Sequence, residues 1–220
     1  MKRKFNLKGI LQRYGEKYSD ILGIKLKSKK DSELFKWFIA SILFGARITE
    51  TIVLNTYKEF ARRGLLSFER MKRANWNELV DALDAGGYVR YDFSTADDLI
   101  SCMKLLGDKY RGSLNRLHKL AKDSKDLEKR LQEFRGIGPT TTTIFLRDLR
   151  GVWKKANPSL GHLATAAAKE LGIRNAKEFW TEHRIPGYDF VNFETALMRL
   201  GREARRKRCK VGHLFGSSFI

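Results

Sequence analysis

The chain has 220 residues and a formal net charge of +19, because 44 lysines and arginines outnumber 25 acidic residues. Hydrophobic residues make up 42% of the sequence and only three residues are proline, which is typical of a globular protein with a substantial core. The basic residues are spread along the whole chain. This charge indicates a polyanionic partner, whose condensed counterions are released when lysine and arginine neutralise its phosphates. A ribosome-associated or merely basic soluble protein is the alternative interpretation.

Cysteine content and hydropathy exclude several classes of protein. Cys102 and Cys209 are too few for a disulfide framework or a four-cysteine metal cluster. The basic start, MKRKFNLKGILQRY, has no long apolar segment behind it, so we expect no signal peptide. The most apolar run, residues 34–46, is about 13 residues long and too short to span a bilayer. We therefore expect a cytoplasmic protein without a targeting signal or membrane association.

The first half of the chain predicts a series of helices. Residues 33–46 are apolar on nearly all sides, so we expect a helix at the centre of the core, with Asp31 or Ser32 as its N-cap. Further helices are expected over residues 49–63, in two short segments led by Ser67 and Asn75, and over residues 94–110 and 124–134.

The stretch EFRGIGPTTTTIFLRDLRG, residues 133–151, could be a strand because its threonines are β-branched. Its apolar residues do not alternate, however, and Pro139 suits the first position of a helix, where its missing N–H is no loss. We therefore predict a helix after Gly138.

The last third of the chain is also predicted to be helical. We expect an alanine-rich helix over residues 161–171, another over NAKEFWTEH (residues 175–183), and a basic amphipathic helix over residues 190–210. The fold class is therefore all-α, with about ten helices joined by short loops.

Helix, Gly-Ile-Gly and helix together make a candidate anion site. We expect Gly136 and Gly138 to allow a tight turn with positive φ. The backbone N–H groups at the start of the next helix would point outward at its positive dipole end, with the hydroxyls of Thr140 and Thr141 in reach of the same phosphate. Such a site binds the DNA backbone and does not read bases. A purely structural corner between two helices is the alternative interpretation.

Four segments, in order, resemble the helix-hairpin-helix DNA glycosylase superfamily, which includes endonuclease III. They are FIASILFGARITETIVLNTYKEF, LVDALDAGGYVRYDFSTADDLISCMKLLGDKYRG, FRGIGPTTTTIFL and FETALMRLGREARRKRC. The resemblance covers roughly residues 33–215. It implies a two-lobed protein: residues 32–149 would form a six-helix barrel ending in the hairpin, and residues 1–31 with 150–220 a second helical lobe.

The resemblance also implies that DNA lies in a cleft and that a damaged or mismatched base is flipped out of the duplex. Arg47 stands where the family places a wedge glutamine, and its guanidinium would fill the gap in the base stack. An ordinary surface arginine is the alternative for Arg47. Arg90 and Tyr88 would line the same cleft.

Three departures from the family pattern concern the chemistry. Thr140 stands where bifunctional members have a lysine nucleophile, which argues for a monofunctional enzyme or for none. The family's catalytic aspartate would fall at residues 159–161, where no carboxylate stands, so Asp148 and Asp189 are the substitute candidates. The iron–sulfur loop of some members is missing, and we expect no metal and no other cofactor.

The sequence therefore predicts a monomeric DNA-repair glycosylase that binds double-stranded DNA and hydrolyses the N-glycosidic bond of a damaged or mismatched base. A catalytically inactive relative that binds damaged or bent DNA is the second hypothesis. A basic structural protein bound to RNA or chromatin is the third.

Overall fold

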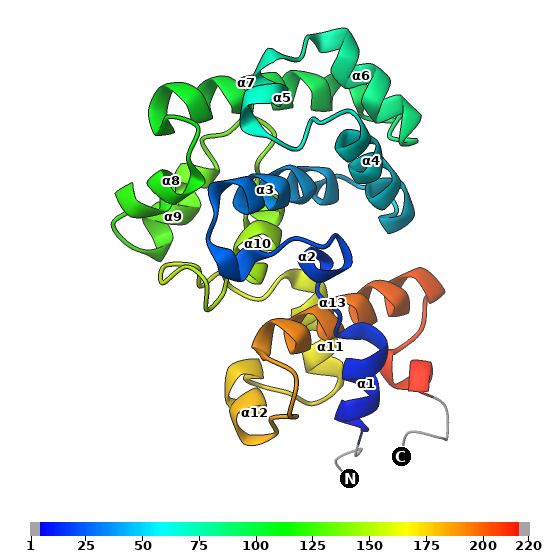
Figure 1. Cartoon of the computed structure of the whole chain (residues 1–220). Coiled ribbons are helices and arrows are strands. Elements are labelled where there is room, and N and C mark those ends of the chain that lie inside the picture. Colours follow the sequence, from blue (N-terminus) through cyan, green and yellow to red (C-terminus); the bar gives the residue numbers. More distant parts are fainter. Residues whose placement is uncertain (1–4, 216–220) are drawn as a thin grey trace. The chain divides into compact units, whose positions relative to one another are not determined.

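The structure is a computed structural model that describes residues 5–215 (Figure 1). This part of the chain contains thirteen α-helices and two short 3-10 helices and no strand, which confirms the all-α class. The chain divides into two compact units. We call residues 22–158 the continuous unit, and the residues up to 21 together with those from 159 onward the split unit. The resemblance placed these boundaries at 31/32 and 149/150.

The continuous unit is organised around one buried helix. Its elements are η1 (Leu26–Ser28), α3 (Asp31–Gly45), α4 (Glu50–Arg62), α5 (Phe68–Arg73), α6 (Trp76–Ala85), α7 (Asp92–Tyr110), α8 (Leu114–Leu120), α9 (Ser124–Leu131) and α10 (Pro139–Asp148). Because α3 is apolar on almost every side, it lies at the centre and packs against α4, α8 and α10. Its Trp37 is fully buried and donates a hydrogen bond to the carbonyl oxygen of Phe145 in α10, 3.0 Å away.

The helix starts are partly as predicted. The side chains of Ser67 and Asn75 cap α5 and α6 by accepting hydrogen bonds from backbone N–H groups three residues on, which confirms both N-caps. The expected cap of α3 is wrong. Its N-cap is Lys30, which makes no side-chain capping bond, and Asp31 instead accepts hydrogen bonds from Ser113 Oγ and the backbone N–H of Asn115. The Asp31 carboxylate therefore binds the start of α8, far away in the sequence, and does not cap α3, as the local pattern predicted.

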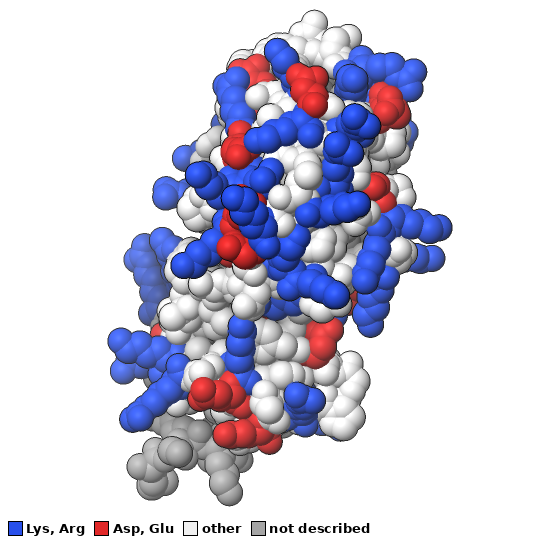
Figure 2. All heavy atoms as spheres, turned by 90° about the vertical axis from the view of Figure 1, so that its left-hand side faces the viewer, with Lys and Arg blue, Asp and Glu red and all other residues white. Residues whose placement is uncertain are grey.

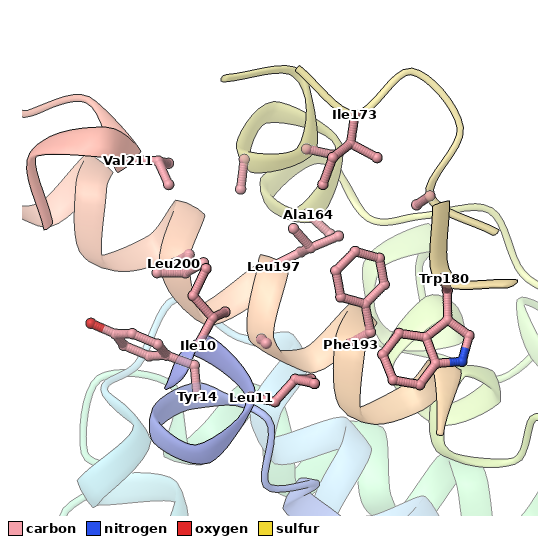
Figure 3. Close-up of a cluster of buried hydrophobic side chains, with 14 of the residues drawn as sticks. Ile10, Leu11, Tyr14, Ala164, Ile173, Trp180, Phe193, Leu197, Leu200 and Val211 are labelled. Carbon is pink, nitrogen blue, oxygen red and sulfur yellow. The ribbon is translucent and has the colours of Figure 1, made fainter. Parts of the chain in front are cut away.

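The split unit joins the two ends of the described chain. Its elements are α1 (Leu7–Tyr14), α2 (Tyr18–Ile21), α11 (His162–Glu170), α12 (Ala176–Glu182), α13 (Phe190–Lys207) and η2 (Val211–Phe215). In its core, shown in Figure 3, Phe193, Leu197 and Leu200 of α13 pack with Ile10 and Leu11 of α1. The sequence predicted neither α1, α2 nor α8.

The alanines of α11 let it approach α13 closely. Ala164, Ala167 and Ala168 are buried, and a Cβ added at Gly201 of α13 would lie 2.3 Å from the carbonyl oxygen of Leu163. The two backbones are therefore in direct contact at this glycine.

A partly buried polar contact links α1 to α13. The Tyr14 hydroxyl donates a hydrogen bond of 2.7 Å to Glu203, and burial, together with the hydrogen bond and charge of Glu203, raises the pKa of Tyr14 to about 12. No helix between residues 5 and 215 has the length and hydropathy required to cross a membrane.

Candidate nucleic-acid interface

Three segments that the sequence singled out meet at the carboxyl end of α3. The first turn of α10 packs there so closely that a Cβ added at Gly45 would lie 2.1 Å from Thr141 Oγ1. The loop that carries Arg90 is held there by Tyr88, whose hydroxyl donates a hydrogen bond of 2.9 Å to the carbonyl oxygen of Leu43. Arg47 follows two residues after Gly45, the last residue of α3. The fold of the continuous unit thus gathers the hairpin, the Arg47 loop and the Arg90 loop.

The hairpin turn depends on one of its two glycines. Gly136 has φ +76°, a left-handed conformation, and a Cβ there would lie 2.2 Å from Asp98 Oδ2. Ile137 between the glycines is buried and anchors the turn to the core. The expectation for Gly138 is wrong: its φ is −91°, its ψ is −174°, and a Cβ there would meet nothing within 4 Å. Gly138 is the extended N-cap residue of α10, and its small size leaves the helix start open.

The start of α10 offers free backbone donors. Pro139 occupies the first helical position, as predicted, and no side chain caps the helix. The first backbone hydrogen bond of the helix runs from Thr142 N–H to the carbonyl oxygen of Gly138, at 3.0 Å. The N–H groups of Thr140 and Thr141 therefore have no acceptor among residues 5–215. Together with the positive end of the helix dipole, they form a site suited to an anion.

The two predicted threonine hydroxyls differ in their surroundings. Thr140 is exposed at the helix start. Thr141 is buried, and its hydroxyl lies against Gly45 of α3. The expectation that both hydroxyls reach one phosphate is therefore wrong for Thr141, because the contact with α3 turns its side chain into the core.

The two predicted arginines are both exposed. Arg47 makes no ion pair or hydrogen bond with any residue in the described part of the chain. The Arg90 guanidinium lies over the Tyr91 ring, with its central carbon 5.4 Å from the ring centroid. Tyr88, expected beside them, is fully buried, and burial raises the pKa of its phenol. Its role in the structure is to hold the Arg90 loop against α3.

An ion-pair cluster supports the hairpin from α7. Arg135, the residue before Gly136, pairs with Asp97 at 3.4 Å and with Asp98 at 3.1 Å. Burial raises the pKa of the Asp98 carboxyl, the Arg135 charge opposes this, and the Asp97 charge raises it further. Arg135 thus offsets the negative charge of two carboxylates close to the turn.

The two candidate catalytic aspartates lie in different units. Asp148 is the last residue of α10, about 14 Å along the helix from Pro139. Its side chain is fully buried, and Oδ1 accepts a hydrogen bond of 2.8 Å from Arg147 Nε. Asp189 belongs to the split unit, is half exposed, and forms the N-cap and capping box of α13. It also pairs with Lys17 at 2.6 Å.

The last predicted positions are the loop where the family aspartate would fall and the candidate metal ligands. Residues 159–161, where the family aspartate would fall, lie in the loop before α11, and His162 is the exposed first residue of that helix. Among residues 5–215, no three histidine, cysteine, aspartate or glutamate side chains are grouped so that they could hold a metal ion.

Basic side chains dominate the visible surface. Figure 2 shows one face on which lysine and arginine side chains are spread widely and acidic side chains are interspersed among them. This distribution agrees with the net charge of +19 and is suited to a polyanion.

The sequence reasoning missed an aromatic pair near the hairpin. Trp76, the first residue of α6, and Phe93, in the first turn of α7, are exposed, and their ring centroids are 5.2 Å apart. The sequence signal for this pair is a large apolar residue between polar neighbours at the start of each of the two helices.

Comparison of the chain with protein-family models, with curated proteins and with solved structures found no match.

Proposed function

We propose that this protein binds duplex DNA through the start of α10 and excises a damaged or mismatched base as a monofunctional DNA glycosylase. The observation that carries the DNA-binding part is the uncapped N-terminus of α10, with two free N–H groups beside exposed Thr140 and Arg47. The phosphate of one strand would lie on these N–H groups. Arg47 and Arg90 then reach the same DNA from neighbouring loops.

The excision step rests on the sequence resemblance and on two carboxylates. A glycosylase stabilises positive charge on the sugar as the base leaves, and a carboxylate also activates the attacking water. Asp189 is the more accessible candidate, whereas Asp148 is fully buried beside Arg147.

The geometry of these aspartates favours a second candidate function, a DNA-damage reader without catalysis. Asp148 is engaged by Arg147, and Asp189 caps α13, so both carboxylates already have structural partners. Such a protein would retain the hairpin, the Arg47 loop and the Arg90 loop, and would not hydrolyse the N-glycosidic bond.

Thr140→Glu is expected to weaken binding to blunt duplex DNA roughly tenfold at about 50 mM salt, because a carboxylate would stand at the phosphate position. A glutamate in the first turn of a helix also favours the helix dipole, so the variant should fold at least as stably as the parent. Fluorescence anisotropy with a labelled duplex measures the affinity.

Thr181→Glu is the matched control, because it makes the same charge change at an exposed threonine of α12 in the split unit. It should reduce affinity less than twofold. Equal affinities of Thr140→Glu and the parent would show that the hairpin is only a corner between helices.

Excision is tested with duplexes that each contain one lesion: uracil, a T·G mismatch, 8-oxoguanine, a methylated adenine or an abasic site. We expect strand cleavage of one substrate, only after alkali, and its loss in Asp189→Asn or in Asp148→Asn. Asparagine at position 189 is still a good N-cap, so that variant separates chemistry from folding. Tight binding of a lesion without cleavage would favour the reader, and cleavage without alkali would require an amine nucleophile.

A further inference from the structure

Trp76 and Phe93 form an exposed aromatic surface on the continuous unit. Trp76 is 37% exposed and Phe93 is 58% exposed, and their ring planes are inclined by 39°. Ile100, two turns further along α7, is 40% exposed and extends the apolar surface. Large apolar side chains that cluster on a surface mark an interaction site more often than single exposed residues do.

Trp76 is held in place by one of the two carboxylates that support the hairpin, Asp97. Trp76 Nε1 donates a hydrogen bond of 3.0 Å to Asp97 Oδ1, and the other oxygen of Asp97 pairs with Arg135 at 3.4 Å. Arg135 directly precedes Gly136. The aromatic surface and the hairpin turn are therefore joined through one aspartate and one arginine.

Three exposed cations stand close to this surface in the sequence, and Asp92 and Asp97 are the acidic residues beside its rings. Arg73 precedes Trp76 by three residues, Arg90 precedes Phe93 by three, and Lys104 follows Ile100 by one helical turn. All three are exposed, and none forms an ion pair with another residue in the 5–215 range. Exposed aromatic rings with cations nearby in the sequence suit single-stranded nucleic acid, whose bases stack on the rings while its phosphates meet the cations.

We propose that Trp76 and Phe93 form a stacking platform for the bases of an unpaired DNA strand that continues from the duplex at the hairpin. The inference rests on the proposed DNA binding through α10 and adds a substrate class, duplex DNA with an adjoining single-stranded segment. Because every base has a π-face, the platform accepts any sequence.

The structure supplies its own reporter for this contact. The chain has four tryptophans, and the other three, Trp37, Trp153 and Trp180, are at most 6% exposed. A base that stacks on Trp76 quenches its fluorescence, so titration with a short oligothymidine should quench the exposed component of the emission. Trp76→Phe should abolish that component and retain binding.

The decisive comparison uses a blunt duplex and the same duplex with an unpaired thymidine tail. The parent protein should bind the tailed duplex about tenfold more tightly, since stacking of one base on an aromatic side chain is of that order. Phe93→Ala should remove this advantage and leave affinity for the blunt duplex unchanged. Phe93→Tyr keeps an aromatic ring and should keep the advantage. Phe93 is largely exposed, so the alanine variant should unfold at the parent's temperature.

The outcomes separate this platform from the hairpin. Thr140→Glu should weaken the binding of both DNAs and keep the preference for the tail. A Thr140→Glu variant that binds both DNAs as tightly as the parent and keeps the tail preference would overturn the proposed function and leave the platform standing. A parent protein without a tail preference, or a Phe93→Ala variant that loses both DNAs equally, would overturn the platform. So would a parent dimer that Phe93→Ala converts to a monomer, because the surface would then bind a second copy of the chain.

Discussion

Gly201→Ala is expected to destabilise the split unit by about 2 kcal/mol, although alanine is the better helix former. The added Cβ would lie 2.3 Å from the carbonyl oxygen of Leu163 and 3.0 Å from its carbonyl carbon. Both atoms are backbone, so α11 has to move away from α13 and disturb the core drawn in Figure 3. The gain in helix propensity, about 1 kcal/mol, offsets only part of this cost.

Urea unfolding gives the stability change, and faster hydrogen exchange of α11 and α13 amides would assign it to the split unit. Gly107→Ala in α7 is the matched control. Its Cβ would lie 3.4 Å from the edge of the Phe68 ring, an ordinary contact, so this variant should gain about 0.5–1 kcal/mol. A Gly201→Ala protein as stable as the parent would mean that the two helices can separate without cost.

The same substitution at the two hairpin glycines is expected to have opposite effects on stability. Gly136→Ser should cost about 3 kcal/mol, because serine in the left-handed region is strained and its Cβ would overlap the Asp98 carboxylate, displacing the ion pair with Arg135. Gly138→Ser should instead stabilise by a few tenths of a kcal/mol, since position 138 is an extended N-cap with open space around it.

DNA binding adds a second measurement at position 138. A serine N-cap hydroxyl accepts a hydrogen bond from the second or third N–H of the helix, and these are the donors that we assign to phosphate. Gly138→Ser should therefore raise the melting temperature and lower the affinity for duplex DNA. A variant that is stabilised and binds DNA as the parent does would place the phosphate elsewhere on the protein.

Local sequence patterns predicted the elements whose formation is decided locally. The all-round apolar character of residues 33–46 placed α3 at the core centre, and the caps at Ser67 and Asn75 follow from short polar side chains that bond nearby N–H groups. Pro139 marked the start of α10 for the same kind of reason. The helix α1 was missed although the sequence carries its local signals, an Asn6 N-cap and apolar residues at helical spacing at Ile10, Leu11 and Tyr14.

The candidate site was predictable in its parts but not in its assembly. The glycines, Arg47 and Arg90 could be named from the sequence, yet only the tertiary packing at Gly45 and Leu43 brings their segments together. The same packing removes Thr141 and Tyr88 from the surface. Likewise, Trp76 and Phe93 lie on separate helices, and no local period predicts that their rings meet.

The division into units imposes an order on folding during synthesis. The continuous unit is complete in sequence once residue 158 has left the ribosome, and domains generally fold as they emerge. Tyr14, in contrast, bonds Glu203, 189 residues further along the chain. Throughout that interval the apolar face of α1, with Ile10 and Leu11, has no α13 to cover it. During synthesis, the folded continuous unit is therefore preceded in the sequence by an exposed hydrophobic segment, which is the kind of surface that chaperones bind.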